Sequence, residues 1–272
     1  MRACKQRHGD RNVSEHKTTM LPILRLTILE AYRTRLPYLW LGIVLLSLAI
    51  GAFVAQLALI EQHLVEVSMV APLLRLLAML VVIFQVCAQT VREMEERQHW
   101  VLLAHALSRW QWLAGRMAGH MVVAGLTALC LGALVWLIWP RPTTLVWHLS
   151  LALECSLLAA IAYLLALVLR HLPRALFACL MVYSLGRFSS VWLSLSETRS
   201  PLIAPGETSV GLVYLMQLID ALVPKFEQFT QTTWLLAATP AWGVLQTPLW
   251  QWLLYVGLLF LVAVFDLQQR EL

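Results

Sequence analysis

Three ionisable side chains lie inside long apolar runs of this sequence, where they could serve binding or gating. Arg75, Glu154 and Arg187 are each flanked by aliphatic or aromatic residues. A charge is costly in hydrocarbon, so such residues normally face protein or water. Counted from the ends of their runs at about 1.5 Å per residue, all three lie at a similar depth, about 12 to 14 Å from one membrane face. Two hypotheses follow: a buried ion pair that fixes the helices, or a contact for an anionic substrate or a gate.

Other chemistry is poorly supported by the residue patterns. An ATP site of the P-loop type needs G-x-x-x-x-G-K-[ST], but Lys5, Lys17 and Lys225 are the only lysines and none follows a glycine. The stretch "MEERQHW" has paired glutamates like one family of membrane proteases, yet Trp100 stands where that family has an arginine. The serines of "GRFSS" lack the flanking glycines of rhomboid proteases. We therefore predict no catalytic residue.

Metal ligands are also not predicted. The five cysteines contain no C-x-x-C pair, and His99, His105 and His120 lack the spacing of a metal site. Met69 and Met79 are ten residues apart, which is about 15 Å along a helix. We expect no metal or cofactor to be bound directly by this chain.

The composition indicates a membrane protein. Of the 272 residues, 60% are hydrophobic and only 13% are charged, and the mean hydropathy of +0.73 is far above that of a soluble domain. The formal charge of +5 does not come from one basic patch with interleaved aromatic residues, so nucleic-acid binding is not predicted.

Six apolar stretches have roughly the 20 residues that a helix needs to cross the hydrocarbon core. They are Tyr38–Ile60, Val67–Ala88, Met117–Trp139, Leu145–Leu169, Leu176–Leu195 and Leu249–Phe265. If the N-terminus is inside, the inner segments carry 15 Lys and Arg residues and the outer ones carry 3. The positive-inside rule then predicts that both termini are cytoplasmic.

The segments outside the spans have distinct predicted roles. Residues 1–19 are polar and basic, without the apolar core of a signal peptide, and are expected to form a disordered tail; Met20 is a second candidate start. Residues 20–36 predict an amphipathic helix on the inner surface, or else an extension of the first span. The outer loop, residues 196–247, contains Gly211–Val223, which is too short to span and predicts an interfacial or re-entrant helix, or a loosely ordered loop.

Residues 89–116, here called the elbow, connect the second and third spans with an unusual amount of charge. Acidic residues open the segment, an apolar helical face follows, and "SRWQ" fits a capping box with Ser108 at its N-cap. A plain connection needs only a few residues, so we expect a helical elbow that displays a docking surface for another protein. The predicted partner-binding residues are Glu93, Glu95, Glu96, Arg97, Trp100, Leu103, Ser108 and Arg109.

The elbow resembles the coupling segment of the membrane permeases of type 2 ABC transporters, notably those associated with multi-copper enzyme maturation. That family has acidic residues and an arginine, a leucine-rich helix, a "PxSR" break and "GKxxG" leading into the third span. The corresponding stretches here are Glu93 to Arg97, Leu102-Leu103-Ala104, Ala106-Leu107-Ser108-Arg109 and Gly115-Arg116-Met117-Ala118-Gly119. Ala106 replaces the family's proline and Arg116 its lysine.

The resemblance, which also covers "LRLTILEAYRTRL" and the ending "FDLQQREL", implies a single permease domain over residues 20–272. It further implies an elbow that acts as a coupling helix on a separate P-loop ATPase subunit carrying ATP and Mg²⁺. A second permease copy and a place in the bacterial inner (plasma) membrane are implied as well. Gly115 and Gly119 predict a close helix approach at the base of the third span.

Two other functions remain open from the sequence. The first is a non-transporting assembly or regulatory subunit that uses the elbow to hold a cytoplasmic partner. The second, a passive channel, is disfavoured because no span shows a repeated polar face. The substrate is not readable from the residues.

Overall fold

The structure, a computed structural model, describes residues 21–33, 36–57, 62–96, 109–191, 210–237 and 242–269. Within these ranges every regular element is a helix and no strand occurs. Five of the helices are long and apolar enough to cross a membrane. The predicted all-α membrane architecture is confirmed at this level. The predicted tail, residues 1–19, lies outside the described ranges.

The five candidate spans coincide with apolar runs that the sequence singles out. They lie in α2 (Leu36–Leu57), α3 (Gln62–Glu95), α5 (Arg109–Ile138), α6 (Pro142–Leu169) and α11 (Gln246–Gln269). Most of these helices run past the apolar stretch, because the backbone hydrogen-bond ladder continues through polar residues until a break stops it. The helix α3 extends furthest, from five residues before the predicted span to seven residues after it.

The predicted fifth span, 176–195, is shifted in the structure. The helix α7 is Leu172–Arg187, begins four residues earlier than expected, and has only 16 residues. At about 1.5 Å per residue it is about 24 Å long, less than the ~30 Å core. It starts early because Arg170 adopts a left-handed conformation, φ 53°, that ends α6, and Pro173 suits the first turn of the new helix. It ends where the backbone bends at Phe188.

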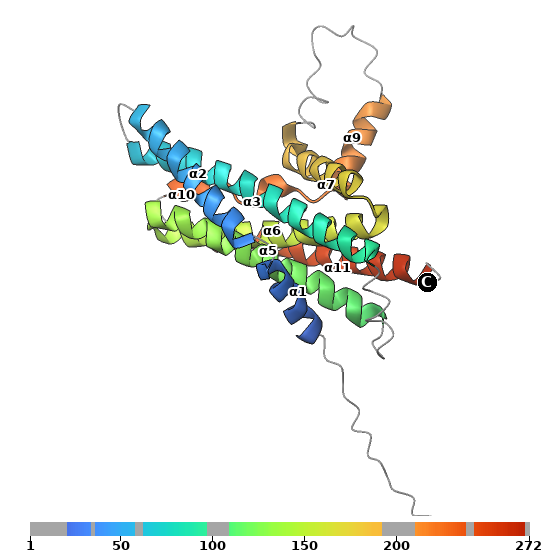
Figure 1. Ribbon diagram of the computed structural model, residues 1–272. Helices are drawn as coiled ribbons and strands as arrows, with labels where there is room; N and C mark the ends of the chain where they lie inside the picture. Colours follow the sequence, from blue (N-terminus) through green and yellow to red (C-terminus); the bar gives the residue numbers. More distant parts are fainter. Residues whose placement is uncertain are drawn as a thin grey trace, which may run out of the picture.

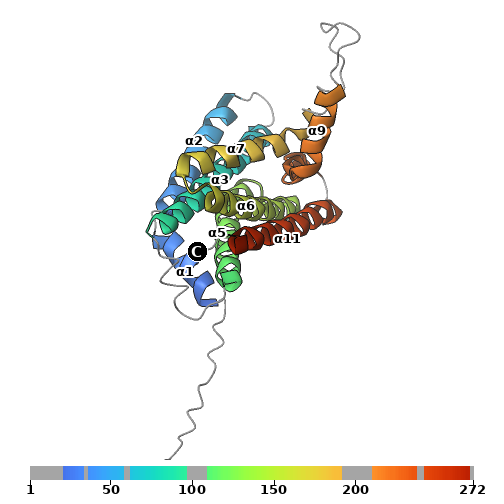
Figure 2. The same ribbon diagram turned by 90° about the vertical axis from the view of Figure 1, so that its right-hand side faces the viewer.

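The helix α6 forms the centre of the molecule. Figure 2 shows α3, α5, α7 and α11 arranged around it, with α2 outside α3. Its sequence is rich in small residues, including Ser150, Ala159, Ala160 and Ala162, which are all buried and let neighbouring helices approach. By contrast, α2 and α11 expose many large apolar side chains along their outer faces. These faces suit a lipid environment.

The shorter helices lie at the edges of this bundle. The predicted surface helix of residues 20–36 is a helix, α1 (Leu21–Arg33), and the predicted outer-loop helix of 211–223 is a helix, α9 (Val210–Leu222). In Figure 1, α1 crosses the bundle at its lower side and α9 projects away from it at the top. After α9 come η1 (Phe226–Gln228), α10 (Thr233–Leu236) and η2 (Trp242–Leu245), which lead to α11.

Gly115 and Gly119 both face α1. A Cβ atom built on Gly115 lies 3.1 Å from Ile23, and one built on Gly119 lies 2.7 Å from Cβ of Thr27. Real Cβ atoms do not approach within 3.0 Å, so α1 can sit this close to α5 only because position 119 is a glycine. The two glycines, one helical turn apart, make a shallow seat for α1 on α5.

We expect Gly119→Ala to destabilise the protein, because the added methyl group must push α1 away from α5. Overpacking of this kind costs about 1 to 3 kcal/mol, although alanine recovers up to about 1 kcal/mol through its helix propensity. The measurement is thermal unfolding of the detergent-purified protein. The matched control is Gly125→Ala on the same helix, where nothing lies within 4 Å of the added Cβ. Equal melting temperatures for the two variants would contradict the close packing.

Candidate functional site

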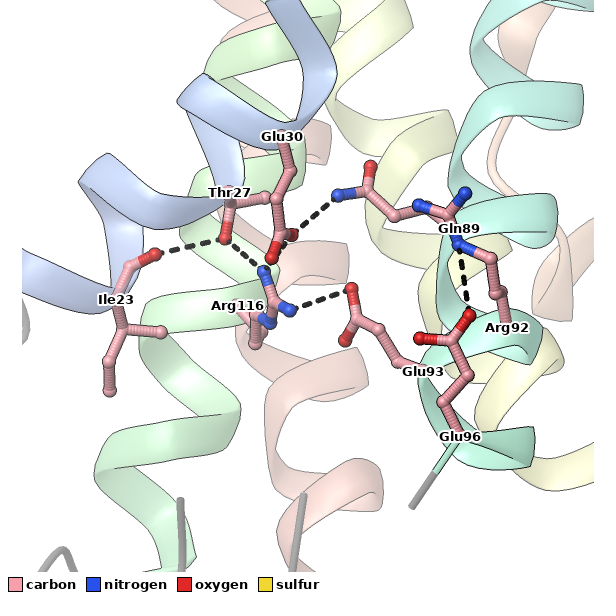
Figure 3. Close-up of polar contacts among 8 residues, drawn as sticks. All are labelled: Ile23, Thr27, Glu30, Gln89, Arg92, Glu93, Glu96 and Arg116. Carbon is pink, nitrogen blue, oxygen red and sulfur yellow. Dashed lines mark hydrogen bonds and ion pairs between the residues drawn. The ribbon is translucent and has the colours of Figure 1, made fainter. Parts of the chain in front are cut away.

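Two clusters of buried polar side chains stand out in this apolar bundle. The first surrounds Arg116, on α5 near the start of the helix, and Figure 3 shows its partners. The Arg116 side chain is only 1% exposed, which is rare for arginine. Its position beside Gly115 and Gly119 places the guanidinium at the junction of α1, α3 and α5, where it can reach both neighbouring helices.

Arg116 donates to two helices at once. Its Nη1 lies 2.8 Å from Glu30 Oε2 and 2.9 Å from Thr27 Oγ1, both on α1, while Nη2 lies 2.8 Å from Glu93 Oε1 on α3. Gln89 of α3 adds a hydrogen bond from Nε2 to Glu30 Oε2, 2.9 Å long. We call these five residues the Arg116 network. Because charged hydrogen bonds are short and directional, it fixes α1, α3 and α5 relative to one another.

Beyond the Arg116 network, two aromatic rings connect α5 to α6. His120 lies one turn after Arg116 on α5, and its ring centroid is 5.3 Å from that of Tyr163 on α6. Both residues are at most 1% exposed. Four helices therefore meet at a polar interior close to where α3 ends and α5 begins.

The predicted partner-binding residues of the elbow do not all lie on the surface. Glu95 and Glu96 are exposed at the end of α3, as a docking surface requires. Glu93 was expected to be displayed as well, but it is 4% exposed and paired with Arg116, so that assignment is corrected: its carboxylate stabilises the bundle instead. Arg97, Trp100, Leu103 and Ser108 fall outside the described residues. Arg109 is the first residue of α5, at the position predicted by a Ser108 cap.

The second cluster gathers the three intramembrane charges. Arg75 comes from α3, Glu154 from α6 and Arg187 from the last turn of α7, and both guanidinium groups interact electrostatically with the Glu154 carboxylate. Neither arginine reaches the 4.0 Å of a direct ion pair with Glu154; instead the carboxylate accepts a hydrogen bond from the Tyr183 hydroxyl, 3.4 Å away. The structure brings both arginines near Glu154, but the buried ion pair of the first hypothesis is not formed directly.

Both arginines donate to the backbone of one stretch whose only helices are the short η1 and α10. We call residues 224–237 the inserted segment; it runs back along α6 after α9. Arg187 Nη1 donates to the carbonyl of Phe226, 2.7 Å away, and Arg75 Nη1 donates to the carbonyl of Thr230. The N–H of Thr230 in turn donates to Ser150 Oγ of α6 over 2.9 Å.

The far part of the inserted segment is held in the same manner. Trp139 donates from its indole nitrogen to the carbonyl of Leu235, 3.2 Å away, and the Thr143 hydroxyl donates to the same oxygen. Irregular backbone at membrane depth is tolerated only where protein satisfies its polar groups. Here side chains from α3, α6, α7 and the connection between α5 and α6 do so. Four side chains of the segment, those of Phe226, Phe229, Thr230 and Leu235, are fully buried.

The sequence did not reveal Arg116 as the centre of the first cluster, or the inserted segment as the partner of the second. Arg116 was identified only by its place in the "GKxxG" resemblance, and Glu30 and Thr27 only as part of an amphipathic helix. One signal was available: Ile23, Thr27 and Glu30 follow helical spacing, so they share one face of α1. No comparable pattern in the sequence predicts that the chain after Pro224 returns to the bundle.

No protein-family model matches this chain, and no curated protein matches it.

We expect Arg116→Met to destabilise the protein by about 3 to 5 kcal/mol, because it removes the cation that pairs with the buried Glu93 carboxylate. The measurement is thermal or denaturant unfolding of the purified protein. The control is Arg92→Met, which removes an exposed partner of Glu96 on α3 and should cost no more than about 1 kcal/mol. Adding Glu93→Met to Arg116→Met should recover part of the loss, and strictly additive effects would argue against the ion pair.

Proposed function

We propose that this chain is the membrane-spanning permease subunit of an ABC transporter. In this proposal it has six spans, with α7 as the fifth, and both termini are cytoplasmic. A separate P-loop ATPase docks on the elbow, and a second permease copy completes the transporter. ATP and Mg²⁺ are bound by the ATPase.

The observation that carries the proposal is the construction of the elbow. The helices α3 and α5 have 34 and 30 residues, or about 51 and 45 Å, against the ~30 Å that a span requires. Much of the excess lies where the two helices connect. Glu95 and Glu96 are exposed there, so charge is available to a cytoplasmic partner.

The Arg116 network supports a mechanical role for this elbow. A push on a flexible connection would be lost as local bending. Here Arg116 pairs with Glu93 across the connection, and with Glu30 of α1, so the ends of α3 and α5 and the surface helix are clamped together. Closure of an ATPase pair against the elbow would then move three helices as one body, and the packed contacts with α6 would pass the motion to the rest of the bundle.

The first test is capture of the ATPase. The tagged full-length protein, purified in mild detergent, is expected to retain a P-loop ATPase in a fixed ratio, and Glu95→Lys with Glu96→Lys should abolish capture because the exposed charge is reversed. The control, Gln268→Lys with Gln269→Lys, adds positive charge at exposed positions near the end of α11 and should leave capture intact. An intact, monodisperse wild-type protein that retains no ATPase would refute the proposal and favour the assembly-subunit alternative.

A second test addresses the topology. With Cys4 changed to Ser, we expect Arg141→Cys to react with a membrane-impermeant maleimide in intact cells, and Glu96→Cys to react only after lysis. Both positions are exposed, at the α5–α6 connection and at the end of α3 respectively. The reverse labelling pattern would place the elbow outside, where it could not meet a cytoplasmic ATPase.

A further inference from the structure

The second cluster uses its charges in an unusual way. Charges that lose contact with water are normally paired with opposite charges. Both arginines of the cluster are part-buried. Arg75 and Arg187 instead donate to two uncharged carbonyls of the inserted segment, those of Thr230 and Phe226. Among the described residues, no carboxylate lies within 4.0 Å of either guanidinium. The segment therefore supplies the direct acceptors of both arginines from its backbone, and it also brings Glu227, which interacts with Arg187 over a longer distance.

The direct partners of the two arginines favour an anion. Both guanidinium groups donate to neutral carbonyls, and the carboxylates that interact with Arg187, those of Glu154 and Glu227, stay beyond 4.0 Å. Further donor capacity is unused: Nε of Arg75 is buried and has no hydrogen-bond partner within the described part of the chain. A ligand with one negative charge would pair with the arginines better than a backbone carbonyl does, because hydrogen bonds between two charged groups are the stronger ones.

The apolar side of the cluster is filled by two phenyl rings. Phe226 and Phe229 are fully buried, and the Phe226 ring lies 5.3 Å from that of Tyr183. Gly186 allows the segment to approach α7, because a Cβ atom there would overlap the carbonyl oxygen of Pro224. If the segment withdraws, the two rings leave apolar space beside the charged groups. The site then suits a molecule with an acidic head and an apolar body.

We propose that Arg75, Glu154, Tyr183 and Arg187 form a ligand site that the inserted segment occupies in this structure, and that its ligand is an amphiphile with one negative charge, such as a long-chain carboxylate. The arginines bind the acidic head, and the apolar chain takes the place of Phe226 and Phe229. That such a ligand is also the transported substrate rests on the proposed function, whereas the binding does not.

The test is a titration of the full-length protein in neutral detergent with a fluorescent 18-carbon polyene carboxylate and, separately, with its methyl ester. The carboxylate is expected to bind at least tenfold more tightly than the uncharged ester. Arg187→Gln should weaken carboxylate binding by about tenfold or more, in line with the loss of a charged hydrogen bond. The matched control is Arg174→Gln, an exposed arginine on the same helix, which should change binding less than twofold.

A third variant separates a displaceable segment from a permanent part of the fold. Ser150→Ala removes the acceptor of the Thr230 N–H without touching the proposed site. If segment and ligand compete, weakening the segment should tighten carboxylate binding by about two- to tenfold. Melting temperatures are recorded for each variant, and Arg75→Gln replaces Arg187→Gln if the latter does not fold.

Three outcomes would overturn the inference: equal binding of carboxylate and ester, equal effects of Arg174→Gln and Arg187→Gln, or unchanged or weaker binding in a folded Ser150→Ala protein. The titration contains no ATPase. A failure here therefore leaves the ATPase capture experiment untouched, and a failure of that experiment leaves this site untouched.

Discussion

A polar group that lies inside the membrane can find a hydrogen-bond partner only within the protein, because the hydrocarbon offers none. A helix satisfies the hydrogen bonds of its own backbone, so backbone groups need other partners mainly where the helices end. The inserted segment runs beside α6 without being a regular helix for most of its length, and side chains of Arg75, Ser150 and Arg187 take over the role of the missing backbone partners. The same constraint explains why Arg116 is surrounded by acceptors from α1 and α3.

The two polar clusters share helices but serve different parts of the molecule. The Arg116 network joins α1, α3 and α5 near the elbow, and the second cluster joins α3, α6 and α7 to the inserted segment. Helix α3 carries a member of each, Glu93 and Arg75, which are 18 residues or about 27 Å apart. A displacement of α3 at the elbow would therefore also move Arg75 in the second cluster. In the proposed transporter, this helix is the physical link between ATP binding and the ligand site.

Much of the helical framework was predictable because it depends on local properties. Apolar runs of sufficient length predicted α2, α3, α5, α6 and α11, and amphipathic or short apolar stretches predicted α1 and α9. The boundaries were less predictable, since α3 continues through polar residues and α7 ends at a bend that hydropathy does not mark. Glu93 was misjudged for the same reason: an acidic residue beside a loop looks exposed until its partner from another helix is known.

Composition, motif and hydropathy are properties of the chain alone, so the sequence was enough to indicate the membrane class, the lack of a P-loop motif and the presence of costly charges within apolar runs. Which groups satisfy the charges depends on the tertiary structure. Arg116 meets Glu30 across 86 positions, and Arg75 meets Thr230 across 155. Such pairings depend on how the helices pack around α6, and packing is a joint property of several helices that no single stretch of sequence specifies.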